Sequence, residues 1–148
     1  MDPELYETLE GQVALVTGAN RGIGAEIGDR LIDMGATVYG GVREPASLSS
    51  RDIEPVRLDV TVAETVETAL EQITDEAGRL DILVNNAGVA PGAGQTLIEE
   101  PIEEIDEVLS VNLRGPILAT KRSLPHLLER AGGRVINVSS GMGRSVRG

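Results

Sequence analysis

The residues best suited to chemistry in this chain are three closely spaced glycines, Gly18, Gly22 and Gly24. Glycines leave backbone N–H groups uncovered, and such groups at the start of a helix attract phosphate with the help of the helix dipole. A glycine-rich turn is a weak signal by itself, because many turns need glycine. Here an apolar run at residues 13–17 precedes the glycines, and apolar residues at helical spacing follow them. This strand–turn–helix context favours a site for the pyrophosphate of a nucleotide.

Polar side chains that follow two later apolar runs form a second group of candidates. Asn85 and Asn86 open the segment NNAG, and Ser139 and Ser140 close the segment NVSS. Their amide and hydroxyl groups suit hydrogen bonding, and no GxSxG turn surrounds Ser140 to make it a nucleophile. Asn112 lies among apolar positions of a predicted helix. An unpartnered amide there costs about 1–3 kcal/mol, so we expect a water or a backbone group as its partner.

The elements that must position these groups alternate along the chain. Strands are predicted over residues 13–17, 37–42, 55–58, 80–84 and 133–138. After the first strand, Ile23, Ile27, Leu31 and Met34 share one helix face, and Gly35 is the stop signal. Short connections between alternating elements predict an α/β fold, a Rossmann-type doubly wound parallel sheet. The expected strand order is 3-2-1-4-5, with the ligand cleft at the carboxyl ends of strands one and four.

Two further helices are predicted between the later strands. Thr61 is expected to cap the first of them, and Glu64 completes a capping box. Pro101 is expected to open the second, and Pro116 to kink it. The acidic pairs at residues 99–100 and 103–104 are interpreted as a solvated helix start, which the helix dipole favours.

The composition restricts the class of protein. The length of 148 residues and the hydrophobic content of 41% predict one domain over residues 1–148. Its core is expected to be aliphatic, because Phe and Trp are absent. A net charge of −11 argues against a nucleic-acid surface. With no cysteine and only His126, no metal site is predicted. Neither a membrane span nor an export signal is predicted, so a cytoplasmic location is expected. The acidic surface fits either a high-salt cytoplasm or an ordinary acidic protein.

The glycine spacing is TGxxxGxG, and it resembles the short-chain dehydrogenase/reductase family. The likeness runs from about Gly11 to the end of the chain, through the segments LDV at 58–60, NNAG at 85–88, VN at 111–112 and INVSSGMG at 136–143. The resemblance implies two catalytic residues: Asn112, which would hold a water in a proton relay, and Ser140, which would bind the substrate oxygen. It implies that Asp59 accepts from the adenine amino group. The glycine turn, the charge of Arg43 and the resemblance together predict these cofactor-binding residues: Gly18, Asn20, Arg21, Gly22, Ile23, Gly24, Arg43, Asp59, Val60, Asn86, Ala87 and Gly88. Asn85 is expected to hold neighbouring strands together.

Charge at the end of the second strand indicates which cofactor is preferred. An NAD-binding site places an acidic residue there for the ribose 2′-hydroxyl, but the position falls at Val42. Arg43 follows directly, and the resemblance places Arg21 close to the same ribose. A guanidinium group holds a 2′-phosphate by paired hydrogen bonds, so the sequence predicts NADP(H). The neighbouring Glu44 weakens this positive field.

The family's Tyr-x-x-x-Lys pair is absent up to Gly148, so the fold is expected to be C-terminally incomplete. Tyr6 and Tyr39 do not replace it, because one precedes the fold and the other lies in a strand. The chain is then a truncated enzyme, one half of a split protein or a natural short form. The expected function is hydride transfer between NADP(H) and a small-molecule carbonyl or alcohol, with this chain alone inactive. The alternative is a non-catalytic nucleotide-binding or interaction module. Expected partners are a second copy or a missing C-terminal segment, without nucleic acid or membrane.

Overall fold

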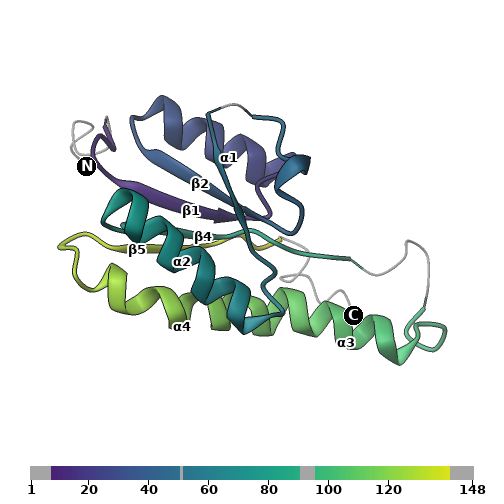
Figure 1. Cartoon of the computed structure of the whole chain (residues 1–148). Helices are drawn as coiled ribbons and strands as arrows, with labels where there is room; N and C mark the ends of the chain where they lie inside the picture. Colours follow the sequence, from purple (N-terminus) through teal and green to yellow (C-terminus); the bar gives the residue numbers. More distant parts are fainter. Residues whose placement is uncertain (1–7, 51, 91–95, 141–148) are drawn as a thin grey trace.

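A computed structural model describes residues 8–50, 52–90 and 96–140. Its centre is a five-stranded parallel sheet in the order β3-β2-β1-β4-β5, as predicted (Figure 1). The strands are β1 (Val13–Thr17), β2 (Thr37–Val42), β3 (Glu54–Arg57), β4 (Ile82–Asn85) and β5 (Arg134–Asn137). The predicted and observed bounds agree for β1 and β2 and differ by one or two residues for the others.

Helices cover both faces of the sheet, so the fold is the predicted Rossmann-type doubly wound arrangement. Helix α1 (Gly22–Asp33) packs on β1 and β2, whereas α2 (Ala63–Ala77) and α4 (Gly115–Leu127) lie together on the opposite face (Figure 1). Helix α3 (Ile102–Leu109) continues through a π-helical turn, η3 (Ser110–Arg114), into α4. A short 3₁₀ turn, η2 (Pro45–Ser47), follows β2. Both core clusters are almost wholly aliphatic, as the composition predicts.

Helix α1 approaches the sheet more closely than its apolar spacing suggests. Its buried residues are Gly24 and Gly28; a Cβ on Gly24 would meet the glycine turn and Asn86, and one on Gly28 would meet the side chain of Ile53. Ile23, which was predicted to share a helix face with Ile27, Leu31 and Met34 and to bind the cofactor, is 63% exposed. Ile27 is partly buried against the core cluster on this face. The predicted stop is confirmed, since α1 ends at Asp33 and Gly35 has a φ of +99°.

The predicted capping box at the start of α2 is wrong. The N-cap is Val62, and no side chain caps the helix. Thr61 instead donates from its hydroxyl and its backbone N–H to Oδ1 of Asp59, at 2.6 and 2.9 Å. Thr61 therefore bonds to the preceding Asp59 and does not cap α2, because hydrogen bonds within a local turn compete with helix capping.

Strand β5 forms one edge of the sheet within the described residues. All four of its residues are exposed, and even the apolar Val135 and Ile136 are 37% and 43% exposed. Residues with the same apolar pattern in β4 are buried, because that strand lies between two neighbours and is covered by helices. The exposure of Val135 and Ile136 therefore follows from the place of β5 at this edge of the sheet and not from its composition.

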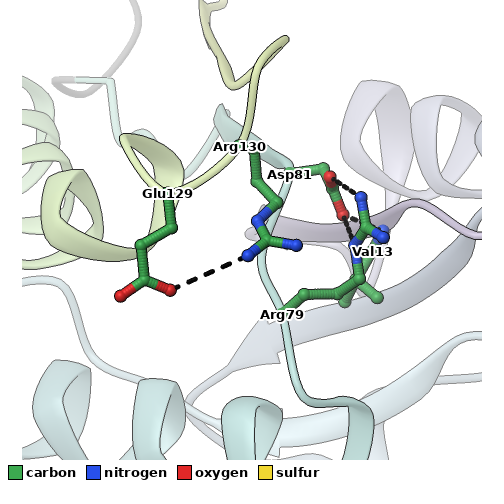
Figure 2. A network of polar contacts seen from close by, with 5 residues as sticks. All are labelled: Val13, Arg79, Asp81, Glu129 and Arg130. Carbon is green, nitrogen blue, oxygen red and sulfur yellow. Dashed lines mark hydrogen bonds and ion pairs between the residues drawn. The ribbon is translucent and has the colours of Figure 1, made fainter.

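A polar cluster lies where β1 and β4 begin, at the end of these strands that is away from the glycine turn (Figure 2). The buried carboxylate of Asp81 accepts the backbone N–H of Val13 at 2.9 Å and two bonds from Arg79, at 2.8 and 2.5 Å. Arg130 lies beside this group and pairs with Glu129 at 3.9 Å. Burial acts to raise the pKa of Asp81, but the bonds from Arg79 and Val13 and the charges of both arginines outweigh it and lower that pKa. The cluster holds the starts of β1 and β4 together.

Replacing Asp81 with asparagine is expected to lower the free energy of unfolding by about 1–3 kcal/mol, because charged hydrogen bonds are lost at a buried place. The pKa of Asp81 is lowered by folding, so its contribution is present above about pH 4 and is lost as pH falls through the lowered value. Urea unfolding of both proteins at several pH values measures this. Asp75→Asn, at an exposed position of α2, is the charge-matched control. An equal loss at all pH values would contradict the assignment.

Candidate functional site

The carboxyl ends of the strands surround a cavity of about 820 Å³. Its walls are the turn after β1, the end of β2, the segments after β3 and β4, and the helix around η3. A cavity at this edge, where the strand order reverses, is where doubly wound sheets bind ligands. All predicted cofactor residues except Gly24 line it: Gly18, Asn20, Arg21, Gly22, Ile23, Arg43, Asp59, Val60, Asn86, Ala87 and Gly88.

The glycine turn requires glycine for two different reasons. Gly18 has a φ of +66°, and a Cβ there would lie 2.9 Å from the Cα of Ala87. Gly24 is buried below the turn, where a Cβ would collide with the side-chain amide of Asn86 and the carbonyl oxygen of Gly18. Gly24 thus acts by letting α1 start against the turn rather than by lining the cavity.

The start of α1 is open to an anion. Its N-cap residue, Arg21, makes no side-chain cap hydrogen bond, and the first turn of the helix holds no acidic residue. The first N–H groups of a helix have no partner within the helix, and the helix dipole gives this end positive character. The turn therefore has the geometry and the charge that a phosphate group requires.

Thr17 and Asn86 join the two main walls of the cavity. The Thr17 hydroxyl oxygen accepts the N–H groups of Asn86 and Ala87, both at 3.0 Å. The amide nitrogen of Asn86 donates to the carbonyl oxygens of Thr17 and Gly18, at 3.2 and 3.1 Å. Thr17 was missing from the predicted site residues, although it begins the glycine motif. Its buried hydroxyl holds the segment after β4 against the glycine turn.

The cavity is lined by both a carboxylate, that of Asp59, and two guanidinium groups, those of Arg21 and Arg43. Burial acts to raise the pKa of Asp59, but the Thr61 hydrogen bonds and the charge of Arg43 outweigh it and lower that pKa. Asp59 is therefore ionised at neutral pH. Both Thr61 contacts use Oδ1, and Oδ2 accepts no hydrogen bond from the described residues. Arg21 and Arg43 line the cavity with Ser47 of η2.

Asn112 has a backbone partner, as predicted, although the residue is exposed and not buried among apolar side chains. Its side chain accepts the N–H of Val89 at 2.8 Å and donates to the carbonyl oxygen of Val89 at 2.7 Å. The residue is exposed, within the π-helical turn η3, and is not among those that line the cavity. In place of a sharp kink at Pro116, the helix has this widened turn just before it. Proline has no N–H, so the carbonyl of Asn112 lacks the donor four residues later that a helix normally supplies.

The other polar candidates lie at the ends of β4 and β5. The amide nitrogen of Asn85 donates to Oδ1 of Asn137 at 2.9 Å and to the hydroxyl of Thr120 at 3.1 Å, which confirms that it joins neighbouring strands. Ser140, three residues beyond β5, is exposed and does not line the cavity. The structure thus brings the predicted cofactor residues together but leaves the role of Ser140 a prediction.

Some lining residues carried no predicted role. Glu107, Ser110 and Val111 come from the helix, and no sequence spacing relates them to strand ends. Among the described residues, no cluster of three or more His, Cys, Asp or Glu side chains is placed to hold a metal ion. No helix in those same segments has the length and apolar character to cross a membrane.

Parallel topology, an open glycine turn and a cavity at the switch point define a nucleotide-binding domain of the Rossmann type. The chain belongs to the short chain dehydrogenase family, whose sequence pattern matches residues 12–147. This agrees with the resemblance that the motifs indicated.

Named relatives and solved structures support the same placement. The 3-oxoacyl-(acyl-carrier-protein) reductase FabG of Vibrio harveyi is 37% identical over 141 residues, covering 91% of this chain and 57% of that protein. The 3-ketodihydrosphingosine reductase of Bacteroides thetaiotaomicron is 37% identical over 135 residues, covering 89% and 48%. The chain spans about half the length of the curated relatives it matches. The structure of 3-ketoacyl-(acyl-carrier-protein) reductase from Brucella melitensis, complexed with NADH, gives a TM-score of 0.84 at 34% identity, covering 93% of this chain and 61% of that chain.

Proposed function

We propose that this chain forms the cofactor-binding part of an NADP(H)-dependent short-chain oxidoreductase that acts on a carbonyl/alcohol pair. One observation carries the proposal: a glycine turn, an uncapped helix start and two arginines meet in one cavity. Uncovered N–H groups suit the pyrophosphate, and the size of the cavity lies in the range of ligand sites. The relatives from Vibrio and Bacteroides have names that describe reduction of an oxo or keto compound, which supports the reaction class.

The preference for NADP(H) rests on the charge around the end of β2. Val42 occupies the place where an acidic residue would bind the ribose 2′-hydroxyl, and Arg21 and Arg43 line the cavity, with the acidic Glu44 beside Arg43. Guanidinium groups bind a dianionic phosphate by charge-assisted, paired bonds. The Brucella relative is complexed with NADH, so cofactor choice has to be argued from the residues of each chain.

When bound, the nicotinamide ring would give hydride to the substrate carbon or take it up. The residues of this chain would position that exchange. Ser140 would orient the substrate oxygen through its hydroxyl. The side chain of Asn112 is engaged by Val89, so its backbone carbonyl is the group proposed to hold a water for the proton path. The proton donor itself would come from the Tyr-x-x-x-Lys pair, so this chain alone is proposed to bind nucleotide without turnover.

A second candidate function is a nucleotide-binding or interaction module without catalysis. One surface favours an interaction: large apolar side chains recur along the α3–α4 helix and are exposed there, with Leu109 at 51%, Leu113 at 58% and Ile117 at 61%. Exposed apolar stripes of this kind mark contact surfaces. The proposed partners are a second copy of the chain or a C-terminal segment, and the proposed location is cytoplasmic.

Calorimetric titration of the chain with NADPH and with NADH tests the cofactor proposal. NADPH is expected to bind more tightly, and chemical-shift changes are expected at the amides of Gly18, Gly22 and Gly24. The amide of Gly78, at the far end of α2, is the internal control and should not move. Similar affinities for both cofactors would contradict the NADP(H) preference. A folded sheet that binds neither cofactor would overturn the whole proposal.

A further inference from the structure

The wall that the helix contributes to the cavity carries a carboxylate with no predicted role. Glu107 of α3 lines the cavity together with Ser110 and Val111, three and four residues later. This spacing places all three on one helix face. Glu107 is exposed, and within the described parts of the chain its carboxylate makes no hydrogen bond or ion pair. It is therefore available to a ligand in the cavity.

The neighbouring wall, formed by the segment after β3, offers further groups that suit the same ligand. Asp59 and Val60 line the same cavity from the segment after β3, and the helix contacts Val60 directly, since a Cβ on Gly115 would lie 2.8 Å from its Cγ2. Val60 and Val111 thus present apolar surface, whereas Asp59 and Glu107 present oxygen acceptors. A flat ring with N–H donors on its edge fits such a combination.

The acceptors are not equivalent. Oδ1 of Asp59 already accepts two hydrogen bonds from Thr61, so Asp59 has one oxygen to offer a ligand. An exocyclic amino group carries two hydrogens and is fully satisfied only by two acceptors. A carboxylate donates nothing, so a carbonyl oxygen in the place of that amino group would face uncompensated negative charge.

We propose that Glu107 accepts a hydrogen bond from the 6-amino group of adenine, beside Asp59, and so selects adenine over a 6-oxo purine. The inference rests on the proposed function, because it assumes that a dinucleotide occupies the cavity. It assigns Glu107 a role that neighbouring carboxylates lack. Glu103 and Glu104 belong to the same helix but do not line the cavity.

The test compares NADPH with its reduced hypoxanthine analogue, in which a 6-oxo group replaces the 6-amino group. Both are titrated calorimetrically into the unchanged chain, Glu107→Gln and Glu103→Gln. The unchanged chain is expected to prefer NADPH, and Glu107→Gln to reduce the affinity ratio about tenfold, because glutamine can also donate to a 6-oxo group. Glu103→Gln makes the same charge change on the same helix and should leave the ratio unchanged.

Two outcomes would overturn the role of Glu107 without affecting the proposed function. One is an affinity ratio that Glu107→Gln leaves unchanged although NADPH binds. The other is a result in which Glu107→Gln raises the affinity for NADPH relative to NADH but leaves the ratio between NADPH and its hypoxanthine analogue unchanged. Glu107 would then repel the 2′-phosphate and make no hydrogen bond to the base. A folded, unchanged chain that binds neither dinucleotide would overturn the proposed function together with this inference.

Discussion

Replacing Gly24 with alanine is expected to abolish nucleotide binding and to destabilise the chain. The added methyl group would collide with the amide of Asn86 and the carbonyl of Gly18, two groups that are bonded to each other at 3.1 Å. Relief requires α1 or the glycine turn to move, and forced overpacking of this kind costs about 1–3 kcal/mol. The same movement takes the phosphate-facing N–H groups out of position, so we expect NADPH affinity to fall at least about 100-fold. Urea unfolding and calorimetry measure the two effects.

Gly132→Ala is the matched control for this prediction. An added Cβ at Gly132 would have nothing within 4 Å, and the residue is not among those with positive φ. It should therefore change neither stability nor affinity. Unchanged NADPH affinity in Gly24→Ala would show that the phosphates bind elsewhere, and the placement of the cofactor would then be wrong.

Removing both Arg21 and Arg43, by replacement with leucine, should abolish the preference for NADPH over NADH. Both residues line the cavity, and Val42 takes the place at the end of β2 where an NAD-binding site has an acidic residue. Glu44, next to Arg43, also lines the cavity and weakens the positive field. Each charged hydrogen bond to a phosphate contributes about 1.5–3 kcal/mol, discounted here because the site is open to solvent. We therefore expect NADPH affinity to fall about 100-fold, with little change for NADH. Calorimetric titration of the double variant with each cofactor measures the ratio.

The control for the arginine prediction is Arg30→Leu, which removes an exposed arginine of α1 that does not line the cavity. It measures how much NADPH affinity falls when a positive charge is removed away from the cavity. A parallel fall in the affinities of NADPH and NADH in the double variant would mean that the arginines bind the pyrophosphate that both cofactors share. The 2′-phosphate would then have no assigned partner.

The order of the sheet and the position of the glycine turn were predictable from local patterns. Buried strands appear as short apolar runs, and β1 is apolar at successive positions because helices cover both faces of the sheet. Alternation of strands and helices leaves few topologies, since crossovers between parallel strands are right-handed. Gly18 needs a positive φ, and such positions are usually glycine.

The predicted helix cap was wrong because two residues compete for the same partner. Thr61 has the type and spacing of a helix cap, yet Asp59 binds it. Ile23 was predicted to share a helix face with Ile27 and also to bind the cofactor; it lines the cavity, whereas Ile27 is partly buried against the core. Local spacing describes which residues share a face, but the distance between elements decides which face is buried.

The sequence by itself determined the fold class, the family resemblance and most of the cavity-lining residues, because these depend on apolar periodicity and on short segments of fixed spacing. Only the tertiary structure decided that Asn112 pairs with the backbone of Val89 and that Glu107 faces the same cavity as Asp59. These pairs are far apart in the chain, and their contact depends on how the α3–α4 helix lies against the sheet. That placement results from packing of the whole core, which no local pattern contains.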